Sequence, residues 1–206
     1  PRPGSLTLVE VAERLWRAEH PTTHDEEEQA PIVLDLGTGS GCLLLALLQS
    51  FPRAIGYGVD ASAEALGVAQ TNALQVLGPD RACHFVHARF ANVECPKHAT
   101  LIVCNPPYHV QGRLLEAATL QYEPAEALFV GEGCDGLSSY REAWRAVTRL
   151  AAPRAVVVME VCRQNASAVY EYLLQHPEGV LQQISMARDD KGCIRSIQGI
   201  YYPPGS

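Results

Sequence analysis

The stretch Ile32-Val33-Leu34-Asp35-Leu36-Gly37-Thr38-Gly39-Ser40-Gly41-Cys42 joins a short apolar run to three alternating glycines. The leucine-rich segment 42–49 follows directly, and this order predicts a strand, a glycine turn and a helix. Glycine has no Cβ atom, so the backbone of residues 37–41 can approach a ligand closely. The stretch therefore predicts an α/β unit that holds a nucleotide-like ligand at the turn.

A second acidic residue, Asp60, indicates which kind of ligand the turn would bind. Segment 55–60 has the pattern of a second strand and ends at Asp60, whose carboxylate can accept the hydroxyl protons of a ribose. Cys42 stands where the dinucleotide fingerprint would need a further glycine, which disfavours a pyrophosphate. An ordinary structural turn with a capping aspartate is the alternative. The acid at the end of the next strand favours a ligand site.

The rest of the chain repeats this alternation. Strands are expected at 32–36, 55–60, 82–86, 101–104 and 155–161, and helices at 42–49, 62–77, 138–150 and 165–175. Two more strand-like runs at 180–187 and 194–202 predict an antiparallel hairpin. An amphipathic helix at 8–16 and a polar, acidic loop at 19–29 come first. We predict a Rossmann-like α/β fold, with a mostly parallel seven-stranded sheet and a C-terminal antiparallel hairpin.

The tetrapeptide Asn105-Pro106-Pro107-Tyr108 follows the apolar run 101–104, at the strand end where open α/β sheets bind ligands. The Asn105 side-chain carbonyl and the Pro106 backbone carbonyl can together accept both N–H donors of a primary amide or exocyclic amine. Two prolines stiffen the backbone that carries these acceptors, and Tyr108 offers a ring face to a planar group. A turn stiffened by proline is the alternative. The order of glycine loop, ribose acid and tetrapeptide favours chemistry at a planar nitrogen.

Composition restricts the partners. The 206 residues carry a formal net charge of -7, which supplies no general attraction for phosphate backbones and disfavours nucleic acid. A hydrophobic content of 47% suits one core. The longest apolar runs fall short of the roughly 20 residues that a membrane span needs. The seven cysteines form no C-x-x-C pair and the histidines have no regular spacing, which disfavours a metal site or cysteine catalysis.

With these motifs, the chain resembles the HemK/PrmC family of protein-(glutamine-N5) methyltransferases over nearly its whole length. Pro1-Arg2-Pro3 followed by Leu8-Val9-Glu10 is similar to the family's P-R-P-x-T-E-x-L-V-E entry. Segment 122–141 is similar to its Y-E-P-x-x-A-L stretch, and Asp189-x-x-Gly192-x-x-Arg195 to its closing D-x-x-G-x-x-R. The N-P-P-Y motif alone is shared with adenine-N6 and cytosine-N4 DNA methyltransferases, so the flanking segments carry the specificity.

The resemblance implies a class I S-adenosylmethionine-dependent methyltransferase. Its substrate would be the glutamine of the Gly-Gly-Gln loop of a peptide-chain release factor. It implies an N-terminal helix and polar connection at 1–30 and a catalytic domain at 31–206, with the family's N-terminal helical domain absent. The location would be intracellular, either cytoplasmic or, if a targeting region has been removed, mitochondrial.

The resemblance also implies the site residues. The expected catalytic residues are Asn105, Pro106, Pro107 and Tyr108. The expected contacts to S-adenosylmethionine are Asp35, Gly37, Thr38, Gly39, Ser40, Gly41, Asp60, Ala61, Ala88, Arg89 and Asn105.

Two segments depart from the family pattern. Gly4-Ser5-Leu6 replaces the family's D-T-E near the entrance to the active site, and His87-Ala88-Arg89-Phe90 replaces an acidic residue and an aromatic near the adenine. Arg89 is expected to stack on the adenine instead. Two alternatives remain open. One is an adenine-N6 methyltransferase on DNA or RNA, which would need a basic face. The other is an inactive cofactor-binding scaffold, against which the intact Asn105–Tyr108 segment argues.

Overall fold

A computed structural model of the chain describes residues 3–21, 29–94, 98–106, 109–110, 129–130, 136–176 and 179–205. Its helices are α1 (Pro3–Glu19), α2 (Cys42–Ser50), α3 (Ala63–Leu77), the short 3₁₀ helix η1 (Phe90–Asn92), α6 (Ser138–Leu150) and α7 (Ala166–Leu174). Its strands are β1 (Ile32–Leu36), β2 (Ile55–Asp60), β3 (Cys83–His87), β4 (Ala99–Cys104), β5 (His109–Val110), β6 (Phe129–Val130), β7 (Ala151–Glu160), β8 (Val180–Arg188) and β9 (Ile194–Tyr202).

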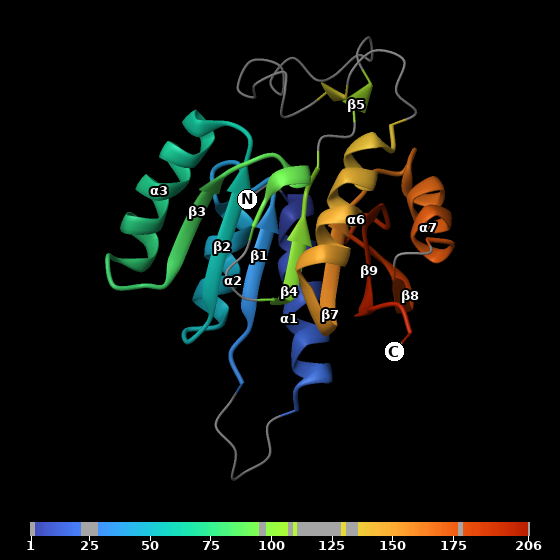
Figure 1. The fold of residues 1–206 in the computed structure, drawn as a ribbon, viewed down its shortest axis with the longest axis horizontal. Helices are drawn as coiled ribbons and strands as arrows, with labels where there is room; N and C mark the ends of the chain where they lie inside the picture. Colours follow the sequence, from blue (N-terminus) through green and yellow to red (C-terminus); the bar gives the residue numbers. More distant parts are fainter. Residues whose placement is uncertain are drawn as a thin grey trace.

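Seven of these strands form one sheet in the order β3-β2-β1-β4-β7-β9-β8 (Figure 1). The strands from β3 to β7 in this order pair in parallel. β9 runs antiparallel to both β7 and β8. The short strands β5 and β6 pair separately. The predicted sheet, mostly parallel and closed by an antiparallel C-terminal hairpin, is confirmed.

Helices cover both faces of the sheet, which explains why the central strands are apolar on both sides. On one face, buried side chains of α1 and α2 such as Leu8, Trp16 and Leu44 pack against alternate residues of β1, β4 and β7. On the other face, α6 and α7 contribute buried residues such as Trp144 and Val169. The chain thus builds three layers, with the sheet in the middle.

Strand register brings the predicted site segments to one edge. Leu36, the last residue of β1, lies opposite Val59 of β2 and Cys104 of β4. Asp60 lies opposite His87 at the ends of β2 and β3. Because these strands are parallel, the connections after β1, β2, β3 and β4 all leave from the carboxyl edge of the sheet. A ligand site is therefore expected at this edge.

Most predicted elements agree with the structure to within one or two residues, but two predicted ranges are wrong. Helix α1 runs from Pro3 to Glu19 and so exceeds the predicted 8–16 at both ends. Strand β7 begins at Ala151, four residues before the predicted start, because Ala151 pairs with Ala99. A register shift follows this pair, and Arg154 has a positive φ of 65°. Such an irregularity keeps proline-containing backbone within a strand. Most of the predicted loop at 19–29 lies outside the described residues.

The segment that resembles the family's closing motif forms the tip of the β8–β9 hairpin. Asp189 Oδ1 accepts hydrogen bonds from the backbone N–H groups of Lys191 (3.0 Å) and Cys193 (2.9 Å). Asp189 Oδ2 accepts one from Arg195 Nε at 2.7 Å. This hydrogen bond from Arg195 is the main reason why the pKa of Asp189 lies below its usual value. The motif therefore has a structural role, which is to shape the turn.

Candidate cofactor and substrate site

The glycine loop after β1 is fastened to the neighbouring strand β2. The backbone N–H groups of Gly37 and Thr38 both donate to the Val59 carbonyl, at 2.8 and 2.9 Å. Gly37, Gly39 and Gly41 have φ values of 77°, 55° and 82°, in the left-handed region that favours glycine. The loop is thus a preformed backbone turn at the carboxyl edge.

Helix α3 supports the outer side of the same loop. Asn72 Nδ2 donates to the Ser40 carbonyl at 2.9 Å. A Cβ atom on Gly41 would lie 3.3 Å from the Ala69 Cβ, so α3 approaches the loop closely at this point. The loop is therefore held between β2 and α3.

Asp60 connects the glycine loop to the start of α3. Its Oδ2 accepts a hydrogen bond from Gly39 N at 2.8 Å, and its Oδ1 accepts one from Ser62 N at 2.9 Å. A carboxylate has about four lone-pair positions, so each oxygen can still accept a hydroxyl proton. Asp60 is only partly buried, so a ligand can reach it. These properties suit the predicted contact with ribose hydroxyls.

Asp35 is fully buried beneath the loop. Thr38 Oγ1 donates to its Oδ2 at 2.7 Å, while its Oδ1 has no hydrogen-bond partner among the described residues. Burial raises the pKa of Asp35 to about 7, an effect that the hydrogen bond from Thr38 and the nearby backbone N–H of Leu44 only partly offset. A cationic group near Oδ1 would favour the charged form, so this orphaned oxygen suits the ammonium group of an amino-acid ligand.

The end of β3 meets the turn after β2. His87 Nε2 donates to the Ala61 carbonyl at 2.9 Å, and Ala88 N donates to the Asp60 carbonyl at 3.0 Å. These bonds bring the predicted cofactor contacts Ala61 and Ala88 close to Asp60. Arg89 is exposed beside them, and its stacking on adenine stays a prediction.

Asn105 leaves β4 next to the glycine loop. A Cβ atom on Gly37 would lie 3.6 Å from the Asn105 carbonyl oxygen and 3.5 Å from Cζ of Phe90. Asn105 is partly buried and Pro106 is buried. The predicted catalytic residues Pro107 and Tyr108 lie outside the described residues. The two predicted parts of the site, for cofactor and for substrate, are thus adjacent at Asn105.

Sequence reasoning missed two residues that shape this site. Phe90 places its ring beside Gly37. Gly58 lies in the middle of β2, and a Cβ atom there would come within 2.9 Å of the Phe85 ring and of Thr38 Oγ1. Glycine inside a strand is a known sign of a close approach, so Gly58 could have been found in this way. Phe90 stands in the segment 87–90 that was expected near the adenine, but nothing in the sequence places its ring beside Gly37.

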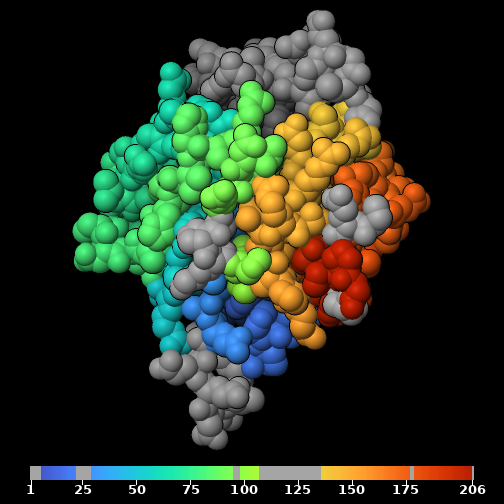
Figure 2. Space-filling view, viewed as in Figure 1, coloured from blue at the N-terminus to red at the C-terminus, as the bar shows by residue number. Residues whose placement is uncertain are grey.

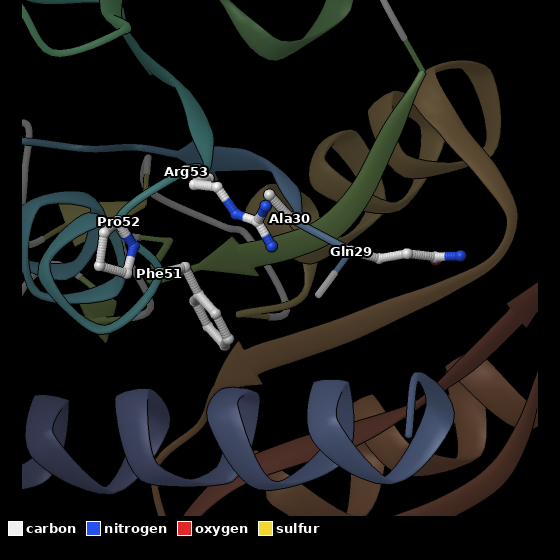
Figure 3. Close-up of a pocket in the computed structure, with 5 residues that line it drawn as sticks. All are labelled: Gln29, Ala30, Phe51, Pro52 and Arg53. Atoms are coloured by element: carbon white, nitrogen blue, oxygen red, sulfur yellow. The ribbon is translucent and has the colours of Figure 1, made fainter. Parts of the chain in front are cut away.

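A cavity elsewhere on the described surface does not belong to this site. It is lined by Gln29, Ala30, Phe51, Pro52 and Arg53 (Figure 3). These residues precede β1 or join α2 to β2, so they lie at the amino edge of the sheet, opposite the glycine loop. The cavity is shallow and brings together no candidate catalytic groups.

Other kinds of site find little support in the described part of the chain. Burial raises the pKa of the Cys104 thiol well above its usual value, and the charges of Asp35 and Glu160 raise it further, which is the opposite of a reactive cysteine. No cluster of three or more potential metal ligands occurs among the described residues. Nor does any helix within them have the length and apolar character needed to cross a membrane.

Comparison with known proteins indicates the family of the chain. Residues 22–128, just over half of the chain, match the family model described as methyltransferase small domain. The chain is similar to the release factor glutamine methyltransferase of Bradyrhizobium diazoefficiens, with 32% identity over 99% of this chain and 65% of that protein. A protein of the same name from Rhodospirillum rubrum is 38% identical over 82% of this chain and 48% of its own length. The chain therefore spans between about half and two thirds of these curated relatives.

Solved structures share the fold. The magnesium protoporphyrin IX methyltransferase from Synechocystis PCC 6803, determined with bound S-adenosylmethionine, superposes with a TM-score of 0.60. The superposition covers 96% of this chain and 79% of that one, at 17% identity. The shared architecture is that of class I S-adenosylmethionine-dependent methyltransferases.

Proposed function

Because the chain belongs to the methyltransferase small domain family, we propose that it transfers a methyl group from S-adenosylmethionine to the side-chain amide nitrogen of a glutamine in a peptide-chain release factor. The observation that carries this proposal is the meeting of the glycine loop, Asp35, Asp60 and Asn105 at one edge of the sheet. The names of the relatives support the choice of glutamine and release factor.

The described residues fit this cofactor. Asp60 would hold the ribose hydroxyls, since both of its oxygens keep free lone pairs while backbone N–H groups fix their orientation. Asp35 would face the ammonium group with its orphaned Oδ1. When bound, S-adenosylmethionine supplies an electrophilic methyl group on a positively charged sulfur.

Asn105 and Pro106 would hold the substrate amide. An amide nitrogen is a weak nucleophile because its lone pair is delocalised, so the enzyme must orient it. The Asn105 side-chain carbonyl and the Pro106 backbone carbonyl would accept its two N–H donors. Orientation of this kind contributes up to roughly 7–11 kcal/mol in the best intramolecular reactions. Pairing of β4 with β1 and β7 on either side gives these acceptors a rigid support.

The cellular partner follows from the substrate. A release factor acts on ribosomes, so we place the protein in a compartment that contains them, which is the cytoplasm or, where a targeting region has been removed, the mitochondrion. The division into an N-terminal segment, residues 1–30, and a catalytic domain, residues 31–206, also stays part of this proposal.

The test is a transfer assay with radiolabelled S-adenosylmethionine. The acceptors are a recombinant release factor, the same factor with the Gly-Gly-Gln glutamine changed to alanine, and a panel of oligonucleotides, and mass spectrometry locates the label. Label on the glutamine that is absent from the alanine variant would support the proposal. Label on adenine would instead support a nucleic-acid methyltransferase, and cofactor binding without any transfer would contradict the proposed activity of this chain.

A variant pair tests the assignment of Asn105. Asn105→Ala removes the acceptor and is expected to lower kcat by roughly 10²–10³-fold, the usual effect of removing one oriented hydrogen-bonding group. Asn105→Asp keeps an acceptor oxygen and should retain more activity than the alanine variant. Cofactor affinity should stay measurable in both. Full activity of Asn105→Ala would refute the assignment.

A further inference from the structure

Arg149 joins helix α6 to the connection that follows β3. Its Nη2 donates to the backbone carbonyls of Phe90 at 3.0 Å and Val93 at 3.1 Å. We call this pair of hydrogen bonds the Arg149 clasp. Hydrogen bonds from a charged donor are about twice as strong as neutral ones. Figure 2 shows the connection after β3, in green, lying directly against α6, in yellow and orange.

The clasp fastens a short segment to a rigid helix. Its acceptors lie at the first residue of η1 and immediately after its last, and the turn itself contains a hydrogen bond from Asn92 N to the Arg89 carbonyl at 3.0 Å. Helix α6 is well anchored because Trp144 and Val147 are fully buried against the sheet. Residues 90–93 lie outside the strands, whereas Asn105 directly follows Cys104, the last residue of β4, which pairs with both β1 and β7.

The clasped segment reaches into the candidate cofactor site. Phe90 packs partly buried against the core, and its Cζ atom lies at ordinary contact distance from the position of a Cβ on Gly37. The two residues before Phe90 are Ala88 and Arg89, which were predicted to border the adenine. A shift of η1 would therefore move the wall of the site beside the glycine loop.

We propose that Arg149 is a positioning residue that sets the affinity for the cofactor by holding Phe90, and the preceding Ala88 and Arg89, against the glycine loop. This inference rests on the proposed function. Arg149 itself lies on the exposed side of α6, and the two hydrogen bonds of the clasp go to backbone carbonyls and not to a predicted site side chain. Because Asn105 directly follows the paired end of β4 and does not depend on η1, the clasp should affect cofactor binding and leave the transfer step unchanged.

The test compares three variants of the full chain. Arg149→Ala removes the clasp, Arg149→Lys keeps a positive donor at the same place, and Arg145→Ala is the matched control. Arg145 lies one turn earlier on the exposed side of α6. Its backbone carbonyl accepts a hydrogen bond from Thr148 Oγ1. The Kd for S-adenosylmethionine is measured by calorimetry, and kcat and the cofactor KM by transfer assay.

The expected pattern is selective. Arg149→Ala should raise the cofactor Kd and KM together, by roughly tenfold, which corresponds to the loss of about 1.4 kcal/mol. The kcat at saturating cofactor should change less than twofold. Arg149→Lys should recover most of the affinity, and Arg145→Ala should behave like the wild type. Amide hydrogen exchange without ligand should become faster at residues 90–94 in Arg149→Ala alone.

Two results would overturn the inference. If Arg149→Ala lowers the melting temperature but leaves the cofactor Kd within twofold of the wild type, the clasp only stabilises the fold. If kcat falls while KM is unchanged, the clasp acts on the transfer step and not on the cofactor. If the wild type binds no S-adenosylmethionine, the proposed function itself fails. Faster exchange at residues 90–94 in Arg149→Ala would still show that the clasp holds this segment in place.

Discussion

Replacing the buried carboxyl of Asp35 by an amide should change how the stability of the fold depends on pH. Asp35→Asn keeps the size of the side chain and leaves an oxygen that can still accept the hydrogen bond from Thr38. The amide has no charge to desolvate. In the wild type, burial raises the pKa of Asp35 from 3.8 to about 7, and the nearby negative charge of Asp60 adds to this increase.

The direction of the effect follows from proton linkage. The folded protein binds the proton of Asp35 more tightly than the unfolded chain does, so the contribution of this group to stability is greatest below pH 3.8. That contribution is lost as the pH rises from about 4 towards 7 and is constant above the folded pKa. Each pKa unit corresponds to about 1.4 kcal/mol, so the loss between pH 5 and pH 8 should be about 2–3 kcal/mol.

The assay is urea unfolding of the wild type and Asp35→Asn at several pH values between 5 and 8. Other titrating groups affect both proteins, so the difference between the two profiles isolates Asp35. The variant is expected to lose about 2–3 kcal/mol less than the wild type over this range. An unpaired amide N–H would lower its stability equally at all pH values and would not change the slope. Parallel profiles would refute the reasoning.

The remaining predictions concern the site and its supports. Cofactor binding should release a proton at pH 6 and hardly any at pH 8.5, because a cation beside Asp35 lowers its pKa. Calorimetry in buffers of different ionisation enthalpy would measure this, and equal proton release at both pH values would count against the ammonium contact. Gly58→Ala should lower stability by about 1–3 kcal/mol and weaken cofactor binding, because the new Cβ would crowd Thr38. Gly67→Ala should instead stabilise the fold by roughly 0.5–1 kcal/mol, because the new Cβ on α3 would meet open space. Thermal unfolding of both variants measures these changes, and a change of the opposite sign in either variant would contradict its prediction. Tyr140→Phe should cost about 1–2 kcal/mol in the same assay, since its buried hydroxyl donates to the Glu160 carbonyl and accepts from Asn165. An unchanged melting temperature would show that this bridge is dispensable.

The order and type of the strands could be predicted from sequence because apolar runs and glycine turns are local signals. Strands β1 and β2 and helix α6 have the predicted bounds, and helix α3 begins one residue after the predicted start because Ser62 is its N-cap, accepting from Ala65 N at 3.2 Å. The early start of β7 was missed because Pro153 and Arg154 interrupt its pattern. Only the pairing of Ala151 with Ala99, a distant residue, extends the strand.

The site was predictable to the extent that its residues stand at strand ends. Asp35, Asp60 and Asn105 lie at or beside the ends of parallel strands, and a parallel sheet brings such ends to one edge. The hydrogen bonds from Arg149 that hold the segment beside the site could not be predicted in this way. Arg149 and Phe90 are 59 positions apart in the chain, and neither has a local pattern that points to the other.

The two aspartates of the site differ in their surroundings, and this difference bears on their roles. Asp60 already accepts two backbone hydrogen bonds, which fix its carboxylate before any ligand arrives. Asp35 has one buried oxygen without a partner among the described residues, so its charged form gains most from a cation. The free energy that burial of Asp35 costs the unliganded fold near neutral pH would be partly recovered when a positively charged ligand binds. Cofactor binding should therefore stabilise the wild type more than Asp35→Asn, and the gap between the two should widen as the pH rises from 5 to 8.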